Sequence, residues 1–94
     1  MNLTEKIEQA KITGKLDLRN CNLTKLPASV CDLEQLKSLD LRYNKLTQLP
    51  ESIGKLSQLL SLNLRWNKIT QLPDNIGKLS QLWQKGTLPF YEEY

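Results

Sequence analysis

The sequence predicts an α/β solenoid, a chain wound into stacked coils, and three observations lead to this prediction. A 23-residue sequence occurs three times in succession, over residues 16–38, 39–61 and 62–84. Within each copy the leucines fall at fixed but unequal intervals, which fit neither a pure strand period nor a pure helix period. One copy alone has too few aliphatic residues to form a core, so neighbouring copies must stack to bury them.

Each copy contains the signals of a strand followed by a helical return. Residues 39–42 (Leu-Asp-Leu-Arg) alternate apolar and polar side chains, which is typical of a strand with one buried face. Ile53, Leu56 and Leu59 are spaced like the inner edge of a helical or 3₁₀ turn. We therefore expect one strand, one turn and one loosely helical return per copy, with the strands paired in a parallel sheet.

The spacing of the leucines resembles that of a known family. From Leu36 the chain reads L-x-x-L-x-L-x-x-N-x-L, which resembles the signature of leucine-rich repeats over about residues 13–82. The resemblance implies a right-handed superhelix with a short parallel sheet on its concave face and helical or 3₁₀ returns on its convex face. It also implies that the amides of Asn44 and Asn67 bond backbone groups of adjacent turns, with Cys21 at that position in the first copy.

A second motif narrows the resemblance to a subclass. The segment from Leu49 to Leu56 has the pattern L-P-x-x-[IV]-x-x-L, which recurs in the third copy. This pattern is similar to that of the intracellular Ras-group leucine-rich repeat proteins and of the repeat arrays in Roco-type GTPases.

The two ends of the chain differ from the repeats. We expect residues 1–15 to form an N-terminal helical cap and lead-in, with a helix over residues 2–12 that begins with a capping box between Asn2 and Glu5. The alternative is a frayed polar terminus. The side chains that would face the first coil are Leu3, Ile7 and Ala10.

At the other end the signature breaks down. A fourth copy starts at Leu82, but Lys85 and Thr87 replace its next leucines, and residues 85–94 form an aromatic-rich tail. We expect this tail either to cover the last coil of its own chain or to join two copies in a homodimer, because an uncovered coil exposes a strand edge. The candidates for self-association are Trp83, Leu88, Phe90 and Tyr91.

The composition of the chain limits the classes of function that it can have. The 94 residues form a single domain, 1–94, with 13 basic and 10 acidic side chains interspersed to a net charge of +3. There is no apolar run long enough for a membrane span and no signal peptide, so we expect a cytoplasmic protein that does not associate with membranes. The absence of histidine, of a CxxC pair and of a glycine-rich phosphate loop argues against an enzyme, a metal site or a cofactor.

The polar strand positions predict a protein-protein interaction scaffold. Strand alternation that buries Leu39 and Leu41 points their polar neighbours outward, where stacking aligns them in columns across the three copies. These columns are Lys15/Ser38/Ser61, Asp17/Asp40/Asn63, Arg19/Arg42/Arg65 and Asn20/Tyr43/Trp66. Tyrosine, tryptophan and arginine are enriched at binding hot spots. We expect a protein or peptide partner to contact Asp40, Arg42, Tyr43, Asn63, Arg65 and Trp66 on the concave face.

Two other interpretations of these columns remain open. The arginines could only pair with neighbouring acids while the rings only shield the sheet, and we expect Asp17 and Asp40 to form such ion pairs. Alternatively, arginines interleaved with aromatics could hold a nucleic acid. Nucleic-acid binding is the less favoured interpretation, because the two aspartates would repel phosphates.

Overall fold

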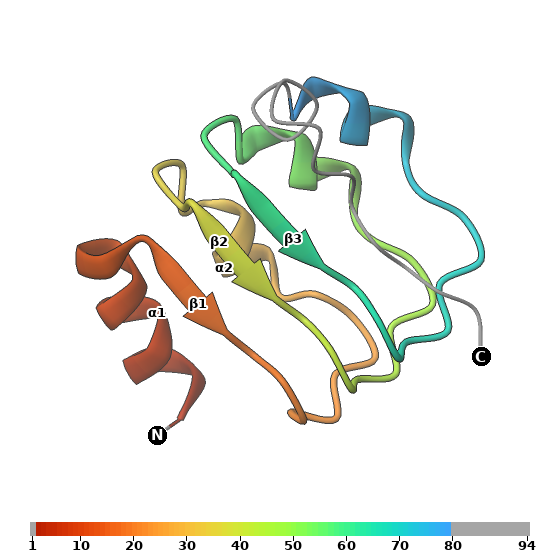
Figure 1. Ribbon diagram of the computed structural model, residues 1–94, viewed down its shortest axis with the longest axis horizontal. Helices are drawn as coiled ribbons and strands as arrows, with labels where there is room; N and C mark the ends of the chain where they lie inside the picture. The colour runs from red at the N-terminus through yellow and green to blue at the C-terminus, as the bar shows by residue number, and fades with distance from the viewer. Residues whose placement is uncertain (1, 80–94) are drawn as a thin grey trace.

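A computed structural model describes residues 2–79, which wind into three coils that lie side by side (Figure 1). A helix, α1, precedes the first coil, and each coil contains one strand and one short helical return. The returns η1 and η2 are 3₁₀ helices, whereas α2 is an α-helix. In chain order the elements are α1 (Leu3–Thr13), β1 (Lys15–Asp17), α2 (Ala28–Cys31), β2 (Ser38–Asp40), η1 (Glu51–Lys55), β3 (Ser61–Asn63) and η2 (Asp74–Lys78).

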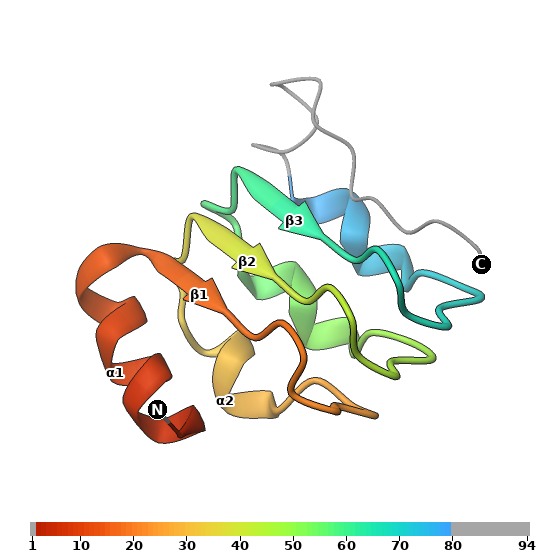
Figure 2. The ribbon, with the colours of Figure 1, turned by 60° about the horizontal axis from the view of Figure 1, so that its bottom comes forward.

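The strands form one parallel sheet in the order β1-β2-β3. Leu16 pairs with Leu39, and Leu39 pairs with Leu62, so equivalent residues of successive copies lie next to each other. The returns all lie on one side of this sheet, which leaves its other side, here called the strand face, without covering helices among the described elements (Figure 2). The predicted repeat solenoid with a short parallel sheet is therefore confirmed.

A single apolar core runs through all three coils between the sheet and the returns. It extends from Ala10 on α1 to Leu79 after η2, and every strand contributes a leucine with at most 2% exposed surface. Such a continuous core explains how short repeats become stable when they stack.

The returns differ in sequence as well as in structure, since residues 28–32 (Ala-Ser-Val-Cys-Asp) correspond to residues 51–55 (Glu-Ser-Ile-Gly-Lys) of the second copy. Cys31 lies at the position that Gly54 and Gly77 hold in the later copies, and glycine disfavours a regular α-helix. Neither Gly54 nor Gly77 has a positive φ, so the backbone conformation at this position does not itself require glycine. Both cysteines are free, with Cys21 exposed and Cys31 buried, and burial raises the pKa of the Cys31 thiol.

Buried asparagines hold successive coils together. The Asn44 amide donates from Nδ2 to the carbonyl oxygens of Leu18 and Leu41, both at 2.9 Å, and its Oδ1 accepts from the amides of Cys21 and Leu23 at 3.1 and 2.9 Å. Asn67 repeats this arrangement one coil later, with Nδ2 2.8 Å from the Leu41 carbonyl and Oδ1 accepting from Leu46 at 3.0 Å. The role that the family resemblance implies for both asparagines is present.

Helix α1 lies beside β1 at the N-terminal end of the solenoid (Figure 1). Asn2 and Glu5 form the expected capping box, because the Glu5 amide donates to Asn2 Oδ1 at 2.9 Å and the Asn2 amide donates to Glu5 Oε1 at 3.3 Å. The helix ends at Gly14, whose φ of 75° is left-handed. Ala10 is buried, whereas Leu3 and Ile7 pack against the core while partly exposed. The end of the third repeat and the tail 85–94 lie outside the described residues.

Candidate functional site

The polar columns predicted for the strand face are present in the structure. Lys15, Ser38 and Ser61 are paired in register, and Asp17, Asp40 and Asn63 form the next row. Backbone pairing continues beyond the strands, since Asn20 donates to the Arg42 carbonyl and Tyr43 donates to the Arg65 carbonyl, both at 3.2 Å. The arginine column and the column of Asn20, Tyr43 and Trp66 are thereby held in register as well.

Two of the three arginines pair with the aspartates, as expected. Arg19 Nη2 lies 2.8 Å from Asp17 Oδ2, and Arg42 Nη2 lies 2.7 Å from Asp40 Oδ2. Arg19 Nε also lies 3.7 Å from Asp40 Oδ2, which links the first coil to the second. Hydrogen bonds from Arg19 lower the pKa of the Asp17 carboxyl, and the same contacts raise the pKa of the Arg19 guanidinium.

Each of these acids also shapes the backbone where its strand ends. Asp17 Oδ1 accepts from the Arg19 amide and Asp40 Oδ1 accepts from the Arg42 amide, both at 3.1 Å. In the third coil, Asn63 Oδ1 accepts from the Arg65 amide at 3.2 Å. The neutral Asn63 side chain therefore accepts the same backbone hydrogen bond as Asp17 and Asp40 but carries no negative charge.

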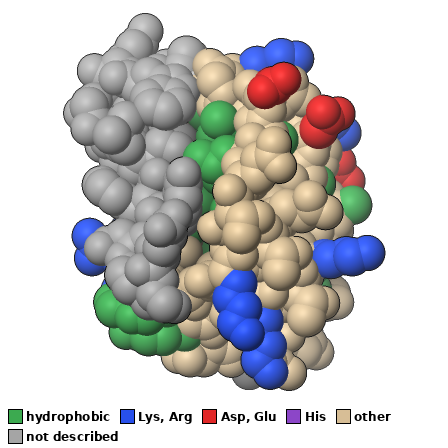
Figure 3. Space-filling model, turned by 90° about the vertical axis from the view of Figure 1, so that its right-hand side faces the viewer, with side chains coloured by type: hydrophobic (Ala, Val, Ile, Leu, Met, Phe, Trp, Pro, Cys, Tyr) green, Lys and Arg blue, Asp and Glu red, His purple; other side chains and the backbone are tan. Residues whose placement is uncertain are grey.

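An aromatic stack lies where strands β2 and β3 end. The rings of Tyr43 and Trp66 are 4.6 Å apart between centroids and inclined by only 6°, and their residues are 45% and 43% exposed. Together with Arg42 and Arg65 they form what we call the aromatic-arginine patch. Figure 3 looks at the end of the solenoid that lies on the right in Figure 1, where Lys or Arg side chains lie near hydrophobic surface at the lower edge and carboxylates gather at the upper edge.

Both rings stand on left-handed backbone, a feature that the sequence analysis missed. Tyr43 has a φ of 61° and Trp66 a φ of 58°, a region that bulky residues rarely occupy. Asn20, at the same position of the first coil, has a φ of 55°. Asparagine tolerates this conformation, so its presence in the first copy was the available signal. Two large side chains are thus held at a costly backbone position on the surface.

The structure places two more cations beside the patch that the sequence analysis did not single out. Lys45 and Lys68 are exposed and follow each aromatic residue by two positions. Their amides donate to the carbonyls of Leu23 and Leu46 at 2.8 Å, so they too lie in register across coils. The predicted self-association residues Trp83, Leu88, Phe90 and Tyr91 lie outside the described residues.

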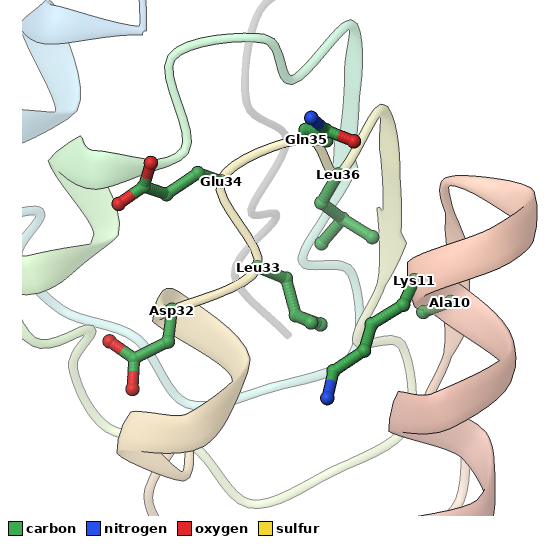
Figure 4. Close-up of a pocket in the computed structure, with 7 residues that line it drawn as sticks. All are labelled: Ala10, Lys11, Asp32, Leu33, Glu34, Gln35 and Leu36. Atoms are coloured by element: carbon green, nitrogen blue, oxygen red, sulfur yellow. The ribbon is translucent and has the colours of Figure 1, made fainter.

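One hollow away from the strand face is poorly suited to a ligand. It lies between α1 and the return that contains α2, has a volume of about 180 Å³, and is smaller than a typical ligand site. Leu33 points into it, whereas the Asp32 and Glu34 carboxylates point away from the Lys11 ammonium (Figure 4). Lys11 instead pairs with Glu8 at 2.8 Å. No polar groups converge in this hollow.

Neither a metal centre nor a membrane segment is found in the described part of the chain. Among residues 2–79 no three His, Cys, Asp or Glu side chains are grouped so that they could hold a metal ion. The same residues contain no helix with the length and apolar character needed to cross a membrane.

Comparisons with known proteins agree with this architecture. Residues 15–85 match the family described as leucine-rich repeat region. The chain is similar to the structure of a leucine-rich repeat protein of Leptospira interrogans, with 44% sequence identity and a TM-score of 0.77 over 85% of this chain. The match covers 20% of that protein, so the chain spans about a fifth of its length. No match was found among the curated proteins.

Proposed function

Because the chain belongs to the leucine-rich repeat family, a fold that generally serves protein interaction, we propose that it is a non-catalytic scaffold that binds a protein or peptide partner. The binding surface is the strand face, which the family resemblance assigns to the concave side of a right-handed coil. The residues in contact with the partner are those of the aromatic-arginine patch, together with Asp40 and Asn63.

The observation that carries this proposal is the stacked pair of Tyr43 and Trp66. The pair contributes little to the core, since both side chains are more than two-fifths exposed. Left-handed backbone at a bulky residue costs on the order of 1–2 kcal/mol. A costly, exposed aromatic pair next to Arg42 and Arg65 supports a binding role, because these are the residue types that dominate interface energetics.

A selection experiment with the full chain tests the proposal. The immobilised chain would select binders from a displayed library of random 12-residue peptides, and the selected peptides would be measured against variants. Trp66→Asn and Tyr43→Asn remove the rings but keep a residue that suits left-handed backbone, as Asn20 does in the first coil. Each should weaken binding about tenfold or more.

A matched control separates loss of binding from loss of structure. Ile12→Ala changes an apolar side chain that is 87% exposed on α1, away from the patch, and should leave binding unchanged. Circular dichroism of each variant must match that of the parent chain. Selected peptides that bind Trp66→Asn as tightly as the parent would refute the strand face as the binding surface.

The L-P-x-x-[IV]-x-x-L motif supports a finer proposal about context. It is similar to that of the Ras-group proteins and the Roco-type arrays, so we place the chain in the cytoplasm as an interaction arm. An exposed free thiol at Cys21 is consistent with a reducing compartment. In that setting the interaction arm would bring its bound partner to an associated domain.

A further inference from the structure

Positive charge rises from coil to coil where the strands end. The equivalent segments are residues 17–22, 40–45 and 63–68, with formal charges of 0, +1 and +2. The first segment is balanced, the second has one cation in excess, and the third has two cations and no carboxylate. Their charged residues are Asp17 and Arg19, then Asp40, Arg42 and Lys45, then Arg65 and Lys68.

This charge is concentrated because the coils are in register. The backbone bonds of Lys45 and Lys68 to the preceding coils place the two lysines in one column, about 4.8 Å apart in the stacking direction. Arg42 and Arg65, whose carbonyls accept from Asn20 and Tyr43 of the preceding coils, form a second column in register. Like charges at this spacing repel each other, so an anionic ligand is favoured here.

Folding does not require the excess of charge. Asp40 and Asn63 accept from the backbone amides of Arg42 and Arg65 at 3.1 and 3.2 Å, so an aspartate at position 63 would fit the same turn. The third coil instead has a neutral side chain beside Trp66, the largest exposed ring in the described residues. The charge excess and the exposed aromatic surface therefore coincide at one place.

We infer that the aromatic-arginine patch, flanked by Lys45 and Lys68, binds an acidic peptide segment in which carboxylates flank an aromatic side chain. This inference rests on the proposed function and names the chemistry of the partner. The aromatic side chain packs on the Tyr43–Trp66 stack, and the carboxylates meet the cations of the second and third coils. A short acidic segment that spans only the second and third coils avoids the Asp17 carboxylate of the neutral first coil, which a longer phosphate backbone along the same row would meet.

Fluorescence anisotropy with defined probes tests the inference. The first probe is a labelled ten-residue peptide with one tryptophan flanked on both sides by glutamates, and the second has glutamine in place of every glutamate. The full chain should bind the glutamate peptide at least tenfold more tightly than the glutamine peptide, and added salt should reduce that difference. Asn63→Asp should weaken binding of the glutamate peptide about fivefold, and Asp40→Asn should strengthen it by a similar factor.

Each outcome separates this inference from the proposed function. If Trp66→Asn abolishes binding of selected peptides while Asn63→Asp and Asp40→Asn change nothing, the strand face remains the binding surface and the acidic partner is overturned. Tight, Trp66-dependent binding of a ten-residue oligothymidylate without binding of the glutamate peptide would replace the peptide by a nucleic acid. If the glutamate peptide binds only after Glu92→Gln and Glu93→Gln, the occupant of the patch is the chain's own acidic segment. That result would overturn the inference of a separate partner.

Discussion

Replacement of Asn44 by alanine should remove most of the stability of the solenoid. The amide is 7% exposed and makes five hydrogen bonds, accepting from Cys21 and Leu23 and donating to Leu18, Leu41 and Arg42. At about 0.5–1.5 kcal/mol for each bond, Asn44→Ala should lower the free energy of unfolding by roughly 3–6 kcal/mol. Domains of this kind have only about 5–15 kcal/mol in total, so the variant should be close to unfolded.

Urea denaturation followed by circular dichroism and tryptophan fluorescence measures this loss. The matched control is Cys21→Ala, since Cys21 holds the equivalent position in the first coil but is exposed and donates only a weak bond to the Arg19 carbonyl at 3.4 Å. The control should lose less than about 1 kcal/mol. A loss below 1 kcal/mol in Asn44→Ala would refute the view that the asparagine ladder joins the coils.

Three further predictions concern pH, packing and association. The hydrogen bond from Arg19 lowers the pKa of Asp17 in the folded state. The contribution of Asp17 to stability is therefore present above the unfolded pKa of about 3.9 and disappears as pH falls through the folded pKa. The difference in urea midpoint between the parent and Asp17→Asn should accordingly vanish on acidification. A Cβ at Gly54 would lie 3.0 Å from Asn75 Cβ, whereas a Cβ at Gly77 would meet no described atom within 4 Å. Gly54→Ala should therefore lower the free energy of unfolding by about 1–3 kcal/mol. Gly77→Ala should leave it unchanged or raise it slightly, as measured by thermal or urea unfolding. Light scattering over a concentration series should detect a dimer if the tail joins two copies, and a monomer at all concentrations would remove that hypothesis; the residues concerned are Trp83, Leu88, Phe90 and Tyr91.

The repeat period was sufficient to predict the register of the sheet. Once Leu16, Leu39 and Leu62 are one period apart, burying them together fixes the rows of their polar neighbours, and the structure has those rows. The aspartate-arginine pairs followed from the same alternation. Contacts between columns could not be predicted from the repeat period. The 3.7 Å approach of Arg19 to Asp40, for example, depends on side-chain rotamers that the period does not determine.

The geometry of the aromatic pair could not be predicted from local propensity. Propensity disfavours left-handed backbone at Tyr43 and Trp66, and here the tertiary requirement of the turn outweighs it. The same holds for the returns, which are an α-helix in the first copy and 3₁₀ helices in the two later copies. Lys45 and Lys68 were overlooked because they lie beyond the strand alternation, although the stacking of coils aligns them equally well.

The pairing of each copy with the next has a consequence for how such a chain can change over generations. The two faces of the middle coil are alike, since the same leucine and asparagine contacts recur 23 residues apart on either side. An in-frame duplication of residues 39–61 would therefore insert a coil whose two neighbours already fit it. A single duplication could in this way lengthen the recognition surface without further changes at the contacts between coils.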